Sequence, residues 1–238
     1  MNSSNLKPMA VPESAMQLET VTVETGPAPV FSIIWMHGLG ADGHDFEPLV
    51  PELLDAGMPA LRFVFPHAPV RPVTINNGYK MRAWYDIIGI DRRSAEDFDG
   101  VQASADAIGA LIRAENARGI STNRIALAGF SQGGAMALHI ATRLDVKLAG
   151  VIALSCYLPL ARQFATERGS ANLATPFFMA HGMQDPVVPF ALGDESRRIL
   201  DGTGYKVEWH QYPMPHALCA EEVVDLRAFL KKISSAQT

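Results

Sequence analysis

Residues 124–140 read RIALAGFSQGGAMALHI, in which one apolar run ends at a glycine-serine-glycine stretch and a second, with helical spacing, begins directly afterwards. The pattern predicts a buried strand that runs into a helix opening at Gln132, with Ser131 in the sharp turn between them. Because such a turn brings strand and helix close together, side chains at Gly129 and Gly133 would collide with neighbouring backbone. The stretch has the form G-x-S-x-G of a nucleophile elbow, which presents a serine hydroxyl at the C-terminal edge of a sheet.

Other apolar runs of similar length lie on both sides of this strand. Four of them mostly lack polar alternation, which is typical of parallel strands buried on both faces. They are VFSIIWMHG (30–38), ALRFVFPHA (60–68), LAGVIALSCY (148–157) and TPFFMAHG (175–182). Two runs alternate more clearly and are expected at an edge of the sheet or late in it, VTVET (21–25) and YKVEWHQYP (205–213).

Stretches with helical spacing separate these runs. They cover residues 45–57, 94–119, 132–144, 191–204 and 221–233. Ser94 and Asp97 have the spacing of a capping box, and Gly119 is placed to end the long helix. The alternation predicts an α/β protein with a mostly parallel central sheet and helices on both faces. With no shift in composition after the first residues, we expect a flexible tail over 1–18 and one domain over 19–238.

Charge and composition exclude several classes of partner. Charged residues make up 19% of the chain, the net charge is −5, and no run of lysine or arginine is present. Nucleic acid and anionic membranes are therefore not expected as partners. The first twenty residues lack the apolar core of a secretory signal, and no apolar run reaches the roughly 18 residues of a membrane span, which favours a cytoplasmic protein without a membrane anchor. The two cysteines fit no metal-binding spacing, so we expect free thiols and no metal site.

A serine nucleophile needs a base to take its proton and an acid to orient that base. In a sheet of this kind they follow in the order serine, acid, histidine, each in a loop after a strand. Asp185 lies in HGMQDPVVP and His216 in MPHALCAEE, in that order. The other six histidines lie within or at the ends of expected elements or, for one, in a loop ahead of the serine, positions more typical of structural braces. We therefore assign Ser131, Asp185 and His216 as the catalytic triad.

The oxyanion of an acyl-transfer reaction needs two N–H donors. The Gln132 amide, at the start of a helix, supplies one. The second comes from a loop after an earlier strand, and the glycine-rich HGLGADG at 37–43 is in that place. This glycine-rich loop in that place directs attention to the Leu39 amide.

With these residues in place, the chain resembles the carboxylesterase, lysophospholipase and acyl-protein thioesterase family of α/β-hydrolases. The resemblance runs from about residue 31 to 230 and rests on separate motifs. They are HGLGADGHDF, FPHAPVRPVTINNGYKMRAWYDI, GFSQGGAMAL, LSCYLPL, HGMQDPVVP and PHALCAEE. It implies the α/β-hydrolase fold without a large lid domain, and the same triad and oxyanion amides. It further implies hydrolysis of short- to medium-chain carboxylic esters, with acyl thioesters or lysophospholipids taken by some members, and no cofactor.

Residues 69–90 look loop-like yet contain Ile75, Met81, Trp84 and Tyr85, which we take as candidates to line an acyl groove. A loop that packs down its own apolar side chains is nearly as good an explanation, and an exposed apolar patch would equally suit a homodimer.

Two other functions remain open from the sequence. One is a different hydrolase on the same fold, a small serine peptidase or a lactone hydrolase, because a triad does not fix the leaving group. A dienelactone-type enzyme is expected to carry cysteine where this chain has Ser131. The other is a ligand-binding protein on a retired hydrolase fold, which would usually lack a triad member.

Overall fold

The structure is a computed structural model that describes residues 16–89 and 95–235. Its centre is a seven-stranded sheet in the order β1-β3-β2-β6-β7-β8-β9. Only β1 runs antiparallel to its neighbour, β3; the other pairs in this sheet are parallel. The strands are β1 (Thr20–Glu24), β2 (Phe31–Met36), β3 (Leu61–Pro66), β6 (Ile125–Phe130), β7 (Gly150–Leu154), β8 (Pro176–Gly182) and β9 (Lys206–Tyr212). The prediction of a mostly parallel α/β sheet is confirmed.

Burial along the strands follows the sequence pattern. Every residue of β2 and β7 is buried, and so is every residue of β6 except the last. The edge strands β1 and β9 largely alternate between more and less exposed positions, because successive side chains point to opposite faces of the sheet and one face is less covered at the edges. Continuous apolar runs therefore mark the centre of this sheet, and alternation marks its edges.

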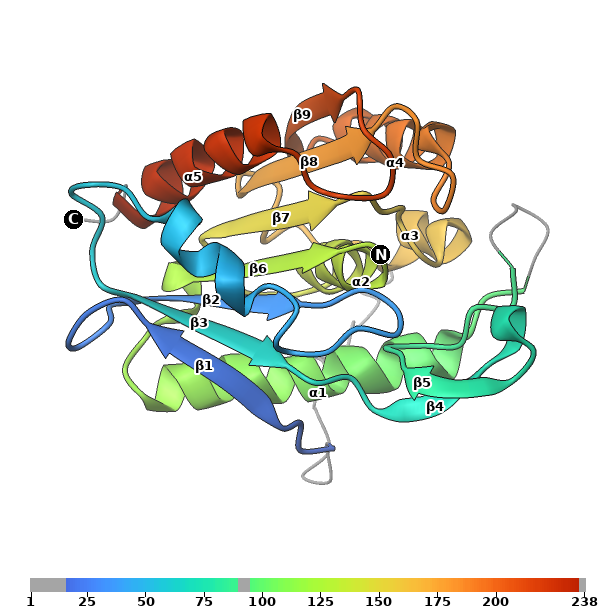
Figure 1. Ribbon diagram of the computed structural model, residues 1–238, viewed down its shortest axis with the longest axis horizontal. Coiled ribbons are helices and arrows are strands. Elements are labelled where there is room, and N and C mark those ends of the chain that lie inside the picture. The colour runs from blue at the N-terminus through green and yellow to red at the C-terminus, as the bar shows by residue number, and fades with distance from the viewer. Residues whose placement is uncertain (1–15, 90–94, 236–238) are drawn as a thin grey trace, which may run out of the picture.

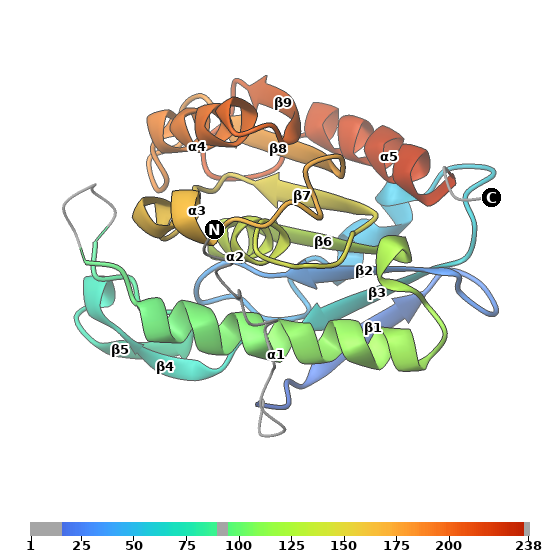
Figure 2. The same ribbon diagram turned by 180° about the vertical axis from the view of Figure 1, so that it is seen from behind.

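Helices cover both faces of the sheet. α5 (Ala220–Ser235) and the 3-10 helix η1 (Glu47–Leu53) lie on the face toward the viewer in Figure 1. The opposite face, seen in Figure 2, carries α1 (Phe98–Ala117), α2 (Gln132–Ala141), α3 (Ala161–Glu167) and α4 (Phe190–Gly202). Two further 3-10 turns are η2 (Thr74–Asn76) and η3 (Thr122–Arg124). Each layer of helices buries its own apolar cluster against the sheet, so both faces of the sheet are covered by a hydrophobic core.

Several elements differ from the sequence prediction. The helix expected over 45–57 is the short 3-10 helix η1, because Pro48 and Pro51 supply no N–H for an α-helical ladder. The long helix begins at Phe98 with Asp97 as its N-cap, three residues after the start expected from the capping box; Ser94 lies outside the described residues. The helix α3 had no counterpart in the prediction.

The segment 69–90, expected to be loop-like, holds a small antiparallel hairpin of β4 (Val70–Val73) and β5 (Tyr79–Arg82). It projects from the lower right of the molecule in Figure 1. Of the predicted tail, residues 1–15 lie outside the described residues, whereas Leu18 is buried in the core beside α1. The end of the tail is thus part of the packed structure.

None of the described helices combines the length and the apolar composition that crossing a bilayer requires.

Candidate active site

Ser131 stands directly between β6 and α2 with a backbone φ of 54° and ψ of −119°. A positive φ is strained for any residue with a side chain, and such strain concentrates at functional sites. The Ser131 amide donates to the Leu154 carbonyl at 2.8 Å, which ties the turn to the end of the neighbouring strand β7. The side chain is half-buried. The strand-to-helix turn predicted from the sequence is therefore present at this residue.

The two glycines of the motif are explained by the approach of α2 to the sheet. A Cβ atom at Gly129 would lie 2.2 Å from the Gly133 carbonyl carbon. A Cβ at Gly133 would lie 2.1 Å from the Met36 carbonyl oxygen of β2. Both contacts are with backbone, which cannot rotate away as a side chain can. Glycine at both positions allows the helix to start this close to the strands.

The backbone donors predicted for the oxyanion lie at this edge. The first intrahelical hydrogen bond of α2 runs from the Ala135 amide to the Ser131 carbonyl at 3.0 Å, so the Gln132 N–H precedes the helical ladder. Within residues 16–89 and 95–235, the Leu39 N–H donates to no backbone carbonyl. Both amides thus keep their donor capacity for a ligand, and the one at the helix N-terminus also carries the favourable end of the helix dipole.

His37 fixes the peptide that carries the Leu39 amide. Its Nε2 accepts from the Ala68 amide at 3.0 Å, so the proton is on Nδ1, which donates to the Gly38 carbonyl at 2.7 Å. This carbonyl and the Leu39 N–H belong to the same peptide group. The Trp84 indole N–H donates to the His37 carbonyl at 2.9 Å. Burial lowers the pKa of His37 to about 4, which keeps the imidazole neutral in this role.

The side chain of Gln132 has a structural role that the sequence did not reveal. It is buried, its Oε1 accepts from the Trp84 amide and its Nε2 donates to the Tyr85 carbonyl, both at 2.8 Å. The residue after Ser131 is therefore clamped to the segment that follows β5. A polar residue opening a helix that packs against a buried sheet was the available signal, since a buried amide needs partners for both ends.

Asp185 and His216, predicted as acid and base, are hydrogen-bonded to each other. The His216 Nδ1–H donates to Asp185 Oδ2 at 2.6 Å. The other carboxylate oxygen accepts from the Val187 and Val188 amides, each at 2.8 Å. The Asp185 side chain is fully buried, so these three donors replace water around its charge.

The His216 ring packs on the residue that precedes Ser131. Its centroid lies 4.7 Å from that of Phe130, with the rings inclined by 46°. Phe130 is the last residue of β6, so this contact places the imidazole over the turn of the elbow. Nδ1 is occupied by Asp185, which leaves Nε2 as the nitrogen able to accept a proton.

The four candidates for an acyl groove separate into two pairs. Ile75 is 43% exposed and Met81 is half-buried, with Met81 Sδ only 3.6 Å from where a Cβ of Gly40 would stand, beside the Leu39 loop. Trp84 is 0% exposed and Tyr85 3%. Trp84 has no exposed surface and packs in the core beneath the site, so its burial argues against a place in a groove. The groove role of Tyr85, Ile75 and Met81 stays a prediction.

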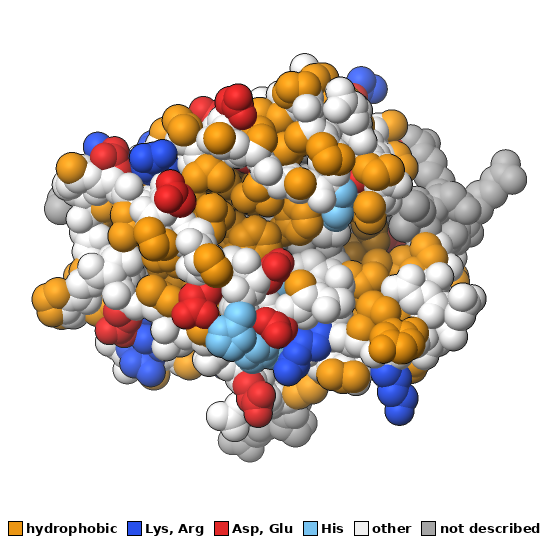
Figure 3. All heavy atoms as spheres, viewed as in Figure 1, with side chains coloured by type: hydrophobic (Ala, Val, Ile, Leu, Met, Phe, Trp, Pro, Cys, Tyr) orange, Lys and Arg blue, Asp and Glu red, His pale blue; other side chains and the backbone are white. Residues whose placement is uncertain are grey.

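Hydrophobic side chains also gather outside the site. Figure 3 shows them at the lower right, over the β4–β5 hairpin, where Val70 is 61% exposed and Tyr79 71%.

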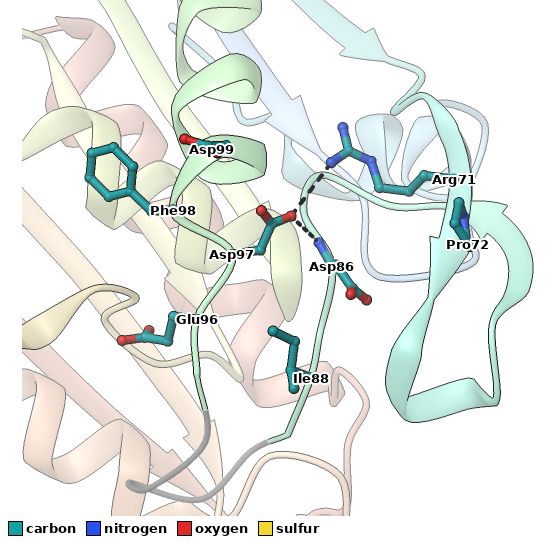
Figure 4. A pocket seen from close by; sticks show the side chains of 8 residues that line it. All are labelled: Arg71, Pro72, Asp86, Ile88, Glu96, Asp97, Phe98 and Asp99. Atoms are coloured by element: carbon teal, nitrogen blue, oxygen red, sulfur yellow. Dashed lines mark hydrogen bonds and ion pairs between the residues drawn. The ribbon is translucent and has the colours of Figure 1, made fainter.

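A separate hollow of about 610 Å³ lies between the hairpin and the start of α1 (Figure 4). Asp97 is central to it and binds the Asp86 amide at 2.8 Å and the Arg71 guanidinium at 3.8 Å. These contacts join the hairpin to the start of α1, so the polar residues that line the hollow have a structural role.

Comparison with known proteins agrees with this geometry. The model of the phospholipase/carboxylesterase family matches residues 19–234. An acyl-protein thioesterase 1 from Mycosarcoma maydis is 37% identical over 239 residues, covering 94% of this chain and 100% of that protein. One from Neurospora crassa is 42% identical over 208 residues, covering 84% of this chain and 85% of that protein.

A solved structure of a related protein has the same fold. The crystal structure of Zea mays acyl-protein thioesterase 2 has a TM-score of 0.82 at 27% identity, covering 91% of this chain and 99% of that chain. The match at the level of sequence covers nearly all of the described residues and includes the elbow and the loops that carry Asp185 and His216. The chain therefore belongs to the phospholipase/carboxylesterase family of the α/β-hydrolases and is a serine ester hydrolase.

Proposed function

We propose that this hydrolase cleaves short- to medium-chain carboxylic esters and acyl thioesters through an acyl-enzyme intermediate on Ser131, with His216 as general base and Asp185 as the acid that orients it. The observation that supports this most directly is the 2.6 Å hydrogen bond from His216 Nδ1 to the buried Asp185, on an imidazole that packs against the residue before the strained serine. Thioesters are included because the curated relatives are acyl-protein thioesterases.

In the proposed mechanism, His216 Nε2 takes the Ser131 hydroxyl proton as Oγ bonds to the carbonyl carbon. The carbonyl π electrons move onto oxygen, and the amides of Leu39 and Gln132 donate to this oxyanion. The carbonyl re-forms, the bond to the leaving group breaks, and His216 returns the proton to the leaving alcohol or thiol. Water then attacks the acyl-enzyme with the same base and releases the carboxylic acid. Asp185 stabilises the imidazolium in both halves.

The test is a set of initial rates on p-nitrophenyl esters from acetate to palmitate, together with an acyl thioester and a lysophospholipid. Changing Ser131 to Ala is expected to reduce kcat by about a million-fold, as removal of a triad serine does elsewhere. Ser121→Ala, at an exposed serine ahead of the start of β6 and so at the opposite end of that strand from the elbow, is the matched control and should leave the rates unchanged. Near-normal turnover by Ser131→Ala would contradict the assignment of Ser131 as the nucleophile.

Two further measurements address the rival functions. Cleavage of a matched amide at an efficiency comparable to the ester would favour a peptidase. Absence of covalent labelling by a fluorophosphonate would favour a binding protein. A cytoplasmic location, a homodimer and the lack of a nucleic acid partner stay predictions from the sequence.

A further inference from the structure

A second histidine reaches the carboxylate of Asp185 from inside the protein. His181 is in β8, and its side chain is 1% exposed. Its Nε2 lies 2.9 Å from the Val188 carbonyl oxygen and 3.5 Å from Asp185 Oδ2. The oxygen that accepts from His216 therefore lies near a nitrogen of each of two imidazoles.

The hydrogen-bond partners determine which nitrogen of His181 carries the proton. A carbonyl oxygen only accepts, so the 2.9 Å contact with Val188 requires N–H at Nε2. Nδ1 has no hydrogen-bond partner among the described residues and faces Gly193, where a Cβ would lie 2.4 Å away. A second proton would thus point at bare backbone. Burial away from water also lowers the pKa of His181 below its ordinary value, which favours the neutral ring.

Val188 connects His181 to the acid. Its carbonyl accepts from His181, and its own amide donates to Asp185 Oδ1 at 2.8 Å. The ring is held from the side by Phe190, with the ring centroids 5.9 Å apart in an edge-on arrangement. This side chain therefore holds the turn that surrounds Asp185, and its Nε2 lies 3.5 Å from the same carboxylate.

We infer that His181 is a positioning residue for the acid of the triad: as a neutral Nε2–H donor it holds the Asp185–Val188 turn, and through it the orientation of His216. It takes no proton during turnover, because a charged form would leave Nδ1–H without an acceptor. This inference rests on the proposed triad. Among the described residues, the ionisable side chain that pairs with this carboxylate besides His181 is His216.

The test compares two substitutions of similar length at position 181. Glutamine places an amide N–H at about the reach of Nε2, whereas methionine fills similar space without a donor. We expect His181→Met to lower kcat by about 10- to 100-fold with KM changed less than about threefold, the size seen when groups that orient a reacting residue are removed. We expect His181→Gln to recover kcat to within about threefold of wild type.

A spectroscopic measurement tests the same idea without turnover. The short His216 Nδ1–H···Asp185 hydrogen bond should give a far-downfield proton resonance in the wild type, which should persist in His181→Gln and shift or broaden in His181→Met. If the methionine variant does not fold, His181→Asn replaces it, because its shorter amide reaches only the Nδ1 position beside Gly193.

A matched control separates positioning from general stability. His139 on α2 is also buried, also has an unpartnered Nδ1 within the described chain, and does not contact Asp185 in the structure. His139→Met should lower the melting temperature and leave kcat unchanged. Equal kcat for the glutamine and methionine variants at position 181, or wild-type kcat in the methionine variant, would overturn the inference. Retained turnover in His216→Ala would instead overturn the triad itself.

Discussion

At the scale of single residues, the close approach of α2 to the sheet can be tested with one methyl group. In Gly133→Ala the new Cβ would stand 2.1 Å from the Met36 carbonyl oxygen, so the helix or the strand must move. We expect a loss of about 3 kcal/mol or more in the free energy of unfolding, the upper range for overpacking, measured by urea denaturation. Gly202→Ala is the control: a Cβ there meets nothing within 4 Å, and the change should be within about 1 kcal/mol. Similar stability for both variants would refute this explanation of Gly133.

The residues that could be predicted from the sequence are those whose chemistry is local or ordered along the chain. Ser131 is marked by its own pentapeptide, and Asp185 and His216 by their order after strands. The clamp made by the Gln132 side chain could not be predicted, because its partners are backbone groups of residues 84 and 85, far away in the sequence. The sequence also does not show which way Trp84 and Tyr85 face, because an aromatic residue in a loop-like stretch can point into the core or out to solvent.

At the scale of elements, Asp97 shows how one side chain starts a helix and joins it to its neighbours. Its Oδ1 accepts from the Gly100 amide at 2.9 Å. Its Oδ2 accepts from the Asp86 amide at 2.8 Å (Figure 4). We expect Asp97→Ala to lower the free energy of unfolding by about 1 to 2 kcal/mol, the range for loss of an N-cap. Urea denaturation measures the change.

Two variants make this test specific. Asp97→Asn keeps an oxygen acceptor and should recover most of the loss, because asparagine caps helices about as well as aspartate. Asp99→Asn removes a charge from the same turn without a capping bond, and should cost no more than about 0.5 kcal/mol at moderate salt. A cost for Asp97→Ala equal to that of Asp99→Asn would show that the cap contributes nothing.

The elements that were predicted well are those with an unbroken pattern. The central strands are continuous apolar runs, and α2, α4 and α5 repeat apolar residues at helical spacing. The prediction was wrong where backbone chemistry overrides the pattern, as in the proline-containing 3-10 helix η1. It was also wrong where a short element depends on contacts elsewhere. The seven residues of α3 contribute one buried side chain, Phe164, to a core built by other segments, which is too little for a periodic signal.

At the scale of the whole molecule, buried ionisable groups set how stability depends on pH. Burial lowers the pKa of His37 to about 4 and of His139 to about 3, and also lowers that of His181. Below pH 6.5 the unfolded chain binds protons at these histidines and the folded chain does not. This contribution to stability is therefore fully present above pH 6.5 and is lost as the pH falls, by about 1.4 kcal/mol per pH unit for each of His37 and His139 until their folded pKa values are reached, with His181 acting in the same direction.

Glu222 acts in the opposite direction. It is 0% exposed in the first turn of α5, and burial raises its pKa from 4.5 to about 8. Between these values the folded chain keeps a proton that the unfolded chain has lost, so this contribution is present below pH 4.5 and is lost as the pH rises to about 8. From pH 4.5 to 6.5 His37 and His139 together outweigh Glu222, and His181 acts in the same direction as they do. Above pH 6.5 the histidines no longer change the stability, and Glu222 alone lowers it. These groups together predict maximal stability near pH 6.5.

Changing Glu222 to Gln tests this balance, because the amide keeps the shape of the side chain and cannot ionise. The gain in the free energy of unfolding over wild type should grow by about 1.4 kcal/mol per pH unit as the pH rises from 4.5 to about 8, and level off above pH 8. The wild-type decline above pH 6.5 should become a plateau. Urea denaturation at a series of pH values measures both, with Glu221→Gln, exposed on the same turn, as the control. A gain that is the same at all pH values would show that Glu222 is ionised in the folded protein, and the alkaline decline would then need another cause.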